Sequence, residues 1–126
     1  MAILDQVRAI LADIRKEIPD IKAITLAGKD GVPIYSDIGF LSSEGIDEET
    51  ISAMGVLIYS TARKLNTAFQ NGVLEELAVS GTEGLTVVYD IGPDAILIMV
   101  LPKETNLGLV KIVTKQAAQR LKEILG

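Results

Sequence analysis

The sequence predicts an α+β fold with the element order α-β-β-α-β-β-β-α, in which helices cover the faces of one five-stranded antiparallel sheet. Three observations predict it. Apolar residues recur at steps of three and four in three segments, as in amphipathic helices. Short runs of apolar and β-branched residues lie between these segments. Tight turns join the last three runs, which favours antiparallel pairing. The chain has 126 residues, so we expect one domain spanning 1–126.

The first half of the chain contains a predicted helix and a predicted hairpin. The helix covers residues 3–18 and ends at Pro19, because the residue before proline avoids helical geometry. Strands follow at residues 22–27 and 32–38. Between them, Lys29 and Asp30 lie between two glycines, which favours a hairpin turn. A phosphate-binding loop needs a longer glycine spacing and a following helix, so no nucleotide site is expected here.

The second half begins with a loop over residues 40–45. Asp47 is a good N-cap for a long helix that runs to Gln70, and Gly72 supplies a left-handed stop. Strands are expected at residues 73–80, 85–90 and 95–101. A final helix begins near residues 104–107 and reaches the end of the chain.

The composition excludes several classes of function. There is no cysteine and no histidine, so thiolate chemistry, the commonest acid–base group and the commonest metal ligands are absent. We therefore expect no catalytic residues, no cofactor and no metal, and hence not an enzyme. The net charge of −5 argues against nucleic-acid binding. The longest apolar run, residues 95–101, is too short to insert into a membrane. No secretory signal begins the chain, which predicts a cytoplasmic protein.

The middle helix has apolar or small residues on more sides than a monomer needs. The side predicted to pack on the sheet carries Ile51, Met54, Ile58, Ala62, Leu65 and Phe69. A second side carries Ala53, Leu57, Lys64 and Ala68. A third side, which a monomer should leave to water, carries Ser52, Val56, Tyr59, Arg63, Asn66 and Gln70. The many small residues, Gly55 among them, predict that this helix packs against a second protein chain. The following strand is a possible exposed edge, although Glu75 and Glu76 could blunt it.

Three strings in this order resemble the roadblock (dynein light chain) family, in its single-domain, MglB-like form. They are DGVPIYS at residues 30–36, the small-residue helix at 53–68 and TNLGLV at 105–110. The resemblance implies a roadblock/profilin-like fold and a homodimer with adjacent middle helices and paired third strands. The implied dimer contacts are Ala53, Leu57, Lys64, Ala68, Leu74, Glu76 and Ala78.

The same resemblance implies that the paired helices bind a Ras-like small GTPase, preferably in its GTP state. The side that would face it carries Ser52, Val56, Tyr59, Arg63, Asn66 and Gln70. Some members accelerate GTP hydrolysis by rearranging the GTPase's own catalytic residues, and others are scaffolds. Because the sequence ends at Gly126, directly after the last helix, exchange-factor activity is not expected.

Two other readings of the sequence stay open. A profilin-like or PAS-like small-molecule sensor also wraps helices around an antiparallel sheet, but only 4% of the residues are aromatic, which is poor material for a ligand pocket. A purely structural scaffold is the other alternative. Arg63 could act as an arginine finger, but its position favours a solvated or interfacial cation.

Overall fold

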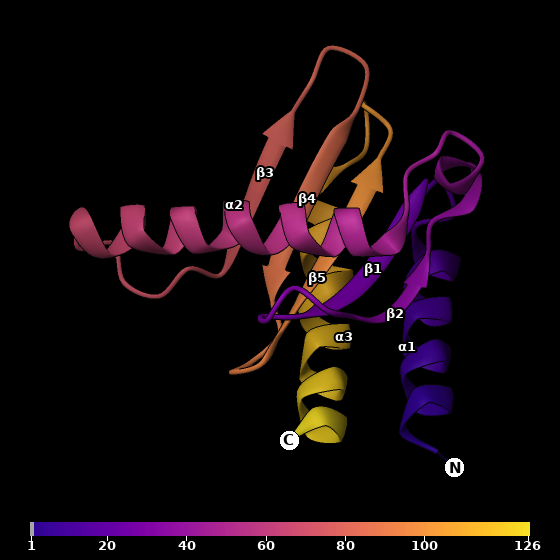
Figure 1. Cartoon of the computed structure of the whole chain (residues 1–126), viewed down its shortest axis with the longest axis horizontal. Helices are drawn as coiled ribbons and strands as arrows, with labels where there is room; N and C mark the ends of the chain where they lie inside the picture. The colour runs from indigo at the N-terminus through magenta and orange to yellow at the C-terminus, as the bar shows by residue number, and fades with distance from the viewer. Residues whose placement is uncertain (1) are drawn as a thin grey trace.

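The computed structural model describes residues 2–126, with the backbone alone for Phe40. Met1, the first residue of the predicted 1–126 domain, lies outside the described residues. The helices are α1 (Ile3–Glu17), the short 3-10 helix η1 (Gly39–Ser42), α2 (Glu48–Ala68) and α3 (Leu107–Leu125). The strands are β1 (Ala23–Gly28), β2 (Pro33–Asp37), β3 (Glu76–Ser80), β4 (Leu85–Asp90) and β5 (Ala95–Leu101). This order confirms the predicted α+β fold (Figure 1).

The five strands form one antiparallel sheet in the order β2-β1-β5-β4-β3. The β1–β2 and β4–β5 connections are hairpins, and β1 also pairs along its length with β5. In the first hairpin, Gly31 has a φ of 88°, and Asp30 accepts a hydrogen bond from the Val32 amide at 3.0 Å. These are features of a turn, which confirms the prediction for residues 28–31.

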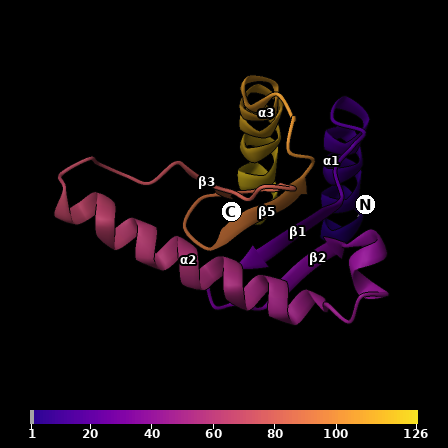
Figure 2. The ribbon, with the colours of Figure 1, turned by 90° about the horizontal axis from the view of Figure 1, so that it is seen from above.

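The sheet separates two hydrophobic layers. Helices α1 and α3 lie together on one face, and α2 crosses the other face (Figure 2). Successive residues of a strand point to opposite faces, so in β5 Leu97 and Met99 contribute to the α1–α3 core, while Ile96 and Ile98 contribute to the α2 core. The C-terminal part of α2 continues past β3 and beyond the edge of the sheet (Figures 1 and 2).

Element ends differ from the sequence prediction in a few places. Asp47 and Asn106 cap α2 and α3, as the pattern predicts for Asp47. The third strand begins at Glu76, three residues later than expected, because residues 73–75 lead from the helix to the sheet. Helix α2 ends at Ala68, and Gln70 takes the left-handed conformation (φ 57°) ahead of Gly72. The predicted loop at residues 40–45 overlaps η1.

Candidate functional site

Helix α2 presents its most apolar side to solvent. Leu57 is 70% exposed and Phe69 is 66% exposed, and Met54, Ile58 and Leu65 are also exposed. Their spacing places these five residues along one side of the helix, and we call them the outer α2 stripe. The sequence pattern assigned four of the five, all except Leu57, to the contact with the sheet. That assignment is wrong for these four, although Ile51 and Ala62 do pack there as predicted.

The side of α2 that contacts the sheet contains Ser52, Gly55 and Tyr59, all of them buried. Any Cβ placed on Gly55 would overlap the side chain of Ile98 in β5. Glycine therefore allows α2 to approach the chain's own sheet closely. The sequence pattern took the small residues of this helix as a sign of a second chain, and for Ser52 and Gly55 that interpretation is wrong.

Tyr59 fixes this orientation of α2 through a polar network. The Tyr59 hydroxyl donates to Asp90 Oδ1 at 2.5 Å. Lys29 Nζ donates to the same oxygen at 2.7 Å and to the carbonyl of Gly92 at 2.6 Å. Lys29 also lies 5.1 Å from the centre of the Tyr59 ring, which is cation–π distance. The network ties α2 to the β1–β2 turn and to the end of β4.

The protonation states in the network follow from its geometry. Burial disfavours a charged Asp90, but hydrogen bonds from Lys29 and Tyr59 outweigh burial and lower the pKa of Asp90. Burial and the bond to Asp90 raise the pKa of Tyr59. At neutral pH, Asp90 is therefore a carboxylate and Tyr59 a neutral donor. No local pattern in the sequence indicates this role for Lys29, because Asp90 lies 61 residues away.

Strand β3 lies at the edge of the sheet and pairs with β4 alone. This confirms the edge position that the sequence suggested. Val79 of this strand is exposed. Glu76 does not project from the edge, since its carboxylate pairs with Lys111 Nζ of α3 at 3.0 Å. Because β3 pairs with β4 alone, its outer backbone groups have no partner strand within the described residues.

The residues expected to face a GTPase do not form one exposed side. Ser52 and Tyr59 are buried, Val56 and Asn66 are half-buried, and Arg63 and Gln70 are exposed. The expectation that Ser52 and Tyr59 are open surface is wrong, because close packing on β5 and the bond to Asp90 turn this side toward the sheet. The exposed remainder lies at the C-terminal half of α2, beside a groove that Arg63, Asn66 and Gln70 line together with Lys29.

The residues expected in a dimer interface fall into two groups. Ala53, Leu57, Lys64 and Ala68 are exposed on α2, and Ala78 is exposed on β3. Leu74 is buried within the protomer among the α2 core residues, so its expected place on an open surface is wrong. Glu76 is half-buried in its ion pair with α3.

Residues 2–126 contain no helix that is both long enough and apolar enough to cross a membrane. Within the same range, no three acidic side chains are grouped so that they could hold a metal ion.

No protein-family model matches the chain. The uncharacterized proteins MJ1340 and MJ0310 of Methanocaldococcus jannaschii are each 31% identical to it over 102 residues, covering 81% of this chain and 85% of each relative.

Solved structures share the fold at lower identity. Myxococcus xanthus MglB matches with a TM-score of 0.84 at 20% identity, covering 97% of this chain and 89% of that chain. A structure described as MglB with tetrameric arrangement gives 0.86 at 18% identity, covering 98% of this chain and 90% of that one. A Roadblock/LC7 domain from Streptomyces avermitilis gives 0.78 at 16% identity, covering 90% and 92%. These matches confirm the predicted roadblock fold. The chain therefore belongs to one family with MJ1340 and MJ0310, and it has the roadblock fold in its MglB-like form.

Proposed function

We propose that this protein is a non-enzymatic homodimeric platform that binds a Ras-like small GTPase and regulates it. The observation that carries the proposal is the outer α2 stripe. A surface helix normally turns its apolar side to the core and its polar side to water. Here five large apolar residues in one line are exposed. Continuous exposed apolar surface of this kind is typical of protein interfaces.

A second copy of the chain is the occupant that fits both features of this surface. Helix α2 extends beyond its own sheet at the edge formed by β3 (Figures 1 and 2). A two-fold related copy would pair β3 with β3 and bring its α2 alongside this one, with the same patch used on both sides. Both the unpaired strand edge and the outer stripe would then be covered. The tetrameric arrangement described for one MglB structure supports assembly in proteins of this fold.

Within this dimer, Leu57 is the residue proposed to lie in the seam, flanked by Ala53, Lys64 and Ala68. Ala78 would contribute from β3. Leu74 is not part of the proposed interface, because the protomer already buries it. Glu76 is proposed to lie only at the margin of the interface. The proposal thus keeps the predicted helix seam and adds Met54, Ile58 and Leu65 from the outer stripe.

The proposed GTPase surface is narrower than the sequence suggested. Arg63 and Gln70 are exposed and Asn66 is half-buried, so these three residues are the proposed contacts on this side of α2. Tyr59 and Ser52 are buried against the sheet, so their proposed role is to position α2 and not to contact the GTPase. Arg63 makes no ion pair within residues 2–126, and a solvated guanidinium beside apolar surface is a common interface contact. The GTPase partner itself is supported by the roadblock resemblance.

The dimer is tested by light scattering on the purified protein at micromolar concentration. Wild type should have the mass of a dimer, and Leu57→Arg should shift it toward monomer, because the change puts an unpaired charge into an apolar seam. Ile112→Arg is a matched control, since Ile112 is 62% exposed but lies on α3, on the other face of the sheet. A monomeric wild type, or equal loss in both variants, would contradict the proposed interface.

The GTPase is tested by a pull-down against the small GTPases of the source organism, with GDP and a GTP analogue compared. Binding should favour the GTP state, and Arg63→Ala should weaken it without changing the mass of the dimer. If Arg63→Ala at saturating concentration abolished an acceleration of hydrolysis, Arg63 would be an arginine finger. A dimer that binds no GTPase in either state would leave only the scaffold and small-molecule sensor readings.

A further inference from the structure

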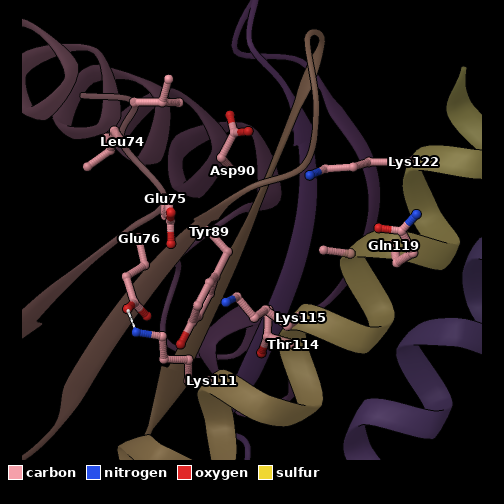
Figure 3. Close-up of a pocket in the computed structure, with 12 residues that line it drawn as sticks. Leu74, Glu75, Glu76, Tyr89, Asp90, Lys111, Thr114, Lys115, Gln119 and Lys122 are labelled. Carbon is pink, nitrogen blue, oxygen red and sulfur yellow. Dashed lines mark ion pairs between the residues drawn. The ribbon is translucent and has the colours of Figure 1, made fainter.

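The segment that joins α2 to β3 is exposed and has little support from packing. Helix α2 ends at Ala68, and the chain regains the protein interior only at Leu74, which lines a groove between α3 and the sheet (Figure 3). Between these two residues, positions 69–73 are all exposed. In both views of the ribbon this segment lies clear of the sheet and of the other helices (Figures 1 and 2). Loop tips of this kind are the least supported parts of a domain.

This segment contains the dipeptide Asn71-Gly72. Gly72 has a φ of 86°, and a Cβ placed on it would meet no atom within 4 Å. Within the described residues, neither the Gly72 amide nor the side chain of Asn71 makes a hydrogen bond. The carboxamide of Asn71 and the backbone nitrogen that follows it are therefore both free, and no side chain on the next residue stands between them.

We propose that Asn71 is a site of spontaneous deamidation. The Gly72 backbone nitrogen, once it has lost its proton, attacks Cγ of the Asn71 side chain. A C–N bond forms, the bond from Cγ to Nδ2 breaks and ammonia leaves, which closes a five-membered cyclic imide. Water then opens the imide at one of its two carbonyls and leaves aspartate or isoaspartate at position 71. The net reaction exchanges ammonia for water, and nothing is oxidised or reduced.

The chain has two other asparagines, and the structure protects both. Asn66 lies inside α2, where the next backbone amide belongs to the hydrogen-bond ladder of the helix. Asn106 caps α3, and its side-chain oxygen accepts from the Leu109 amide at 3.2 Å. The residue after it is Leu107, whose branched side chain crowds the nitrogen that would have to attack. Position 71 alone combines a free carboxamide with an unhindered and unbonded nitrogen.

The reaction would place a new charge at the end of α2. One carboxylate replaces one neutral amide, so the net charge becomes one unit more negative than −5. Gln70 and Gly72 line the groove beside Arg63, so this carboxylate would lie at the margin of the proposed GTPase surface. Isoaspartate also adds one backbone atom to the connection between α2 and β3. Only this consequence, and not the reaction itself, rests on the proposed function.

The test is incubation of the purified full chain in water labelled with heavy oxygen, with a free peptide of residues 68–75 in a parallel sample. Peptide mapping by mass spectrometry should show labelled aspartate and isoaspartate at position 71, and unchanged asparagine at positions 66 and 106. The rate in the protein should lie within about tenfold of the rate in the peptide, because an unsupported loop opens at little cost in free energy. The rate should rise with pH, because the attacking nitrogen must lose its proton.

Matched variants separate this mechanism from general hydrolysis. Gly72→Ala should slow the reaction severalfold in both protein and peptide, because a methyl group crowds the nitrogen. Thermal unfolding checks that this variant keeps its fold, since Gly72 has a positive φ. Gly81→Ala, in the β3–β4 turn, should leave the rate unchanged.

Four results would overturn the proposal. They are a rate in the protein more than about tenfold below that in the peptide, equal conversion at all three asparagines, aspartate without isoaspartate, and an unchanged rate in Gly72→Ala. Each of them is read from the isolated chain, so a failure here is distinct from a failure to bind a GTPase.

Discussion

Replacing Tyr59 with phenylalanine removes a single oxygen atom and tests whether the Tyr59 hydroxyl holds α2 in its orientation. Tyr59 is 3% exposed, and its hydroxyl donates to Asp90 Oδ1 at 2.5 Å. Phenylalanine keeps the ring, its packing in the α2 core and its position beside Lys29. The variant therefore removes one hydrogen bond to a charged acceptor and little else.

The size of the effect follows from the surroundings of Asp90. A hydrogen bond to a charged group contributes about 1.5–3 kcal/mol. Asp90 keeps its bond from Lys29 at 2.7 Å, and its side chain is 19% exposed, so water can replace part of what is lost. The low end of the range applies. We expect the free energy of unfolding to fall by about 1.5 kcal/mol.

The assay is urea unfolding at one fixed protein concentration, because dimerisation would make stability depend on concentration. Tyr35→Phe is the matched control: Tyr35 is half-buried, and its hydroxyl makes no hydrogen bond within the described residues, so we expect a change below about 0.5 kcal/mol. Equal stability of wild type and Tyr59→Phe would refute the reasoning, because the bond to Asp90 would then contribute nothing to holding α2.

The pH dependence provides an independent check. The pKa of Asp90 is lowered in the folded state, so its contribution to stability is complete above the unfolded value of about 3.9 and is lost as pH falls through the lower folded pKa. Without the Tyr59 hydroxyl, the folded pKa of Asp90 rises toward its ordinary value. The difference between wild type and Tyr59→Phe should therefore be constant near neutral pH and shrink in acid.

Two further predictions concern α2. Gly55→Val should destabilise the fold by about 1–3 kcal/mol, because the new side chain meets Ile98 in a packed core; thermal unfolding measures it, and partial rescue by Ile98→Ala would show that the clash is the cause. Asp47→Ala should lower the urea midpoint, because Asp47 Oδ1 accepts from the Thr50 amide at 2.7 Å at the start of the helix. Asp47→Asn should behave like wild type in the same assay, and equal loss in both variants would contradict a capping role.

Much of the fold was predictable because its signals are local. The hairpin at residues 28–31 depends on glycine geometry, and the start of α2 depends on Asp47 as a cap. Strands β4 and β5 match the predicted residues 85–90 and 95–101. The start of β3 was less predictable, because pairing with β4, and not the apolar character of Val73, decides where the strand begins.

The orientation of α2 was not predictable from its periodicity. The helix carries one apolar stripe and one stripe of small and polar residues, and hydrophobicity favours the apolar stripe as the inner one. Two non-local contacts instead place the stripe of small and polar residues against the sheet. Gly55 fits closely over Ile98, and Tyr59 finds Asp90, which lies 31 residues later. Neither contact can be read from the helix alone.

The inversion of α2 strengthens the case for a partner. A surface helix normally buries its apolar stripe and presents its polar side to water. Here the sheet contact is secured by close fit and a hydrogen-bond network, so the large apolar residues remain available outside. A second surface packed on Leu57 and Leu65 would remove this apolar area from water. Tyr59 would then be a positioning residue: by fixing the rotation of α2, it determines which side of the helix such a surface would meet.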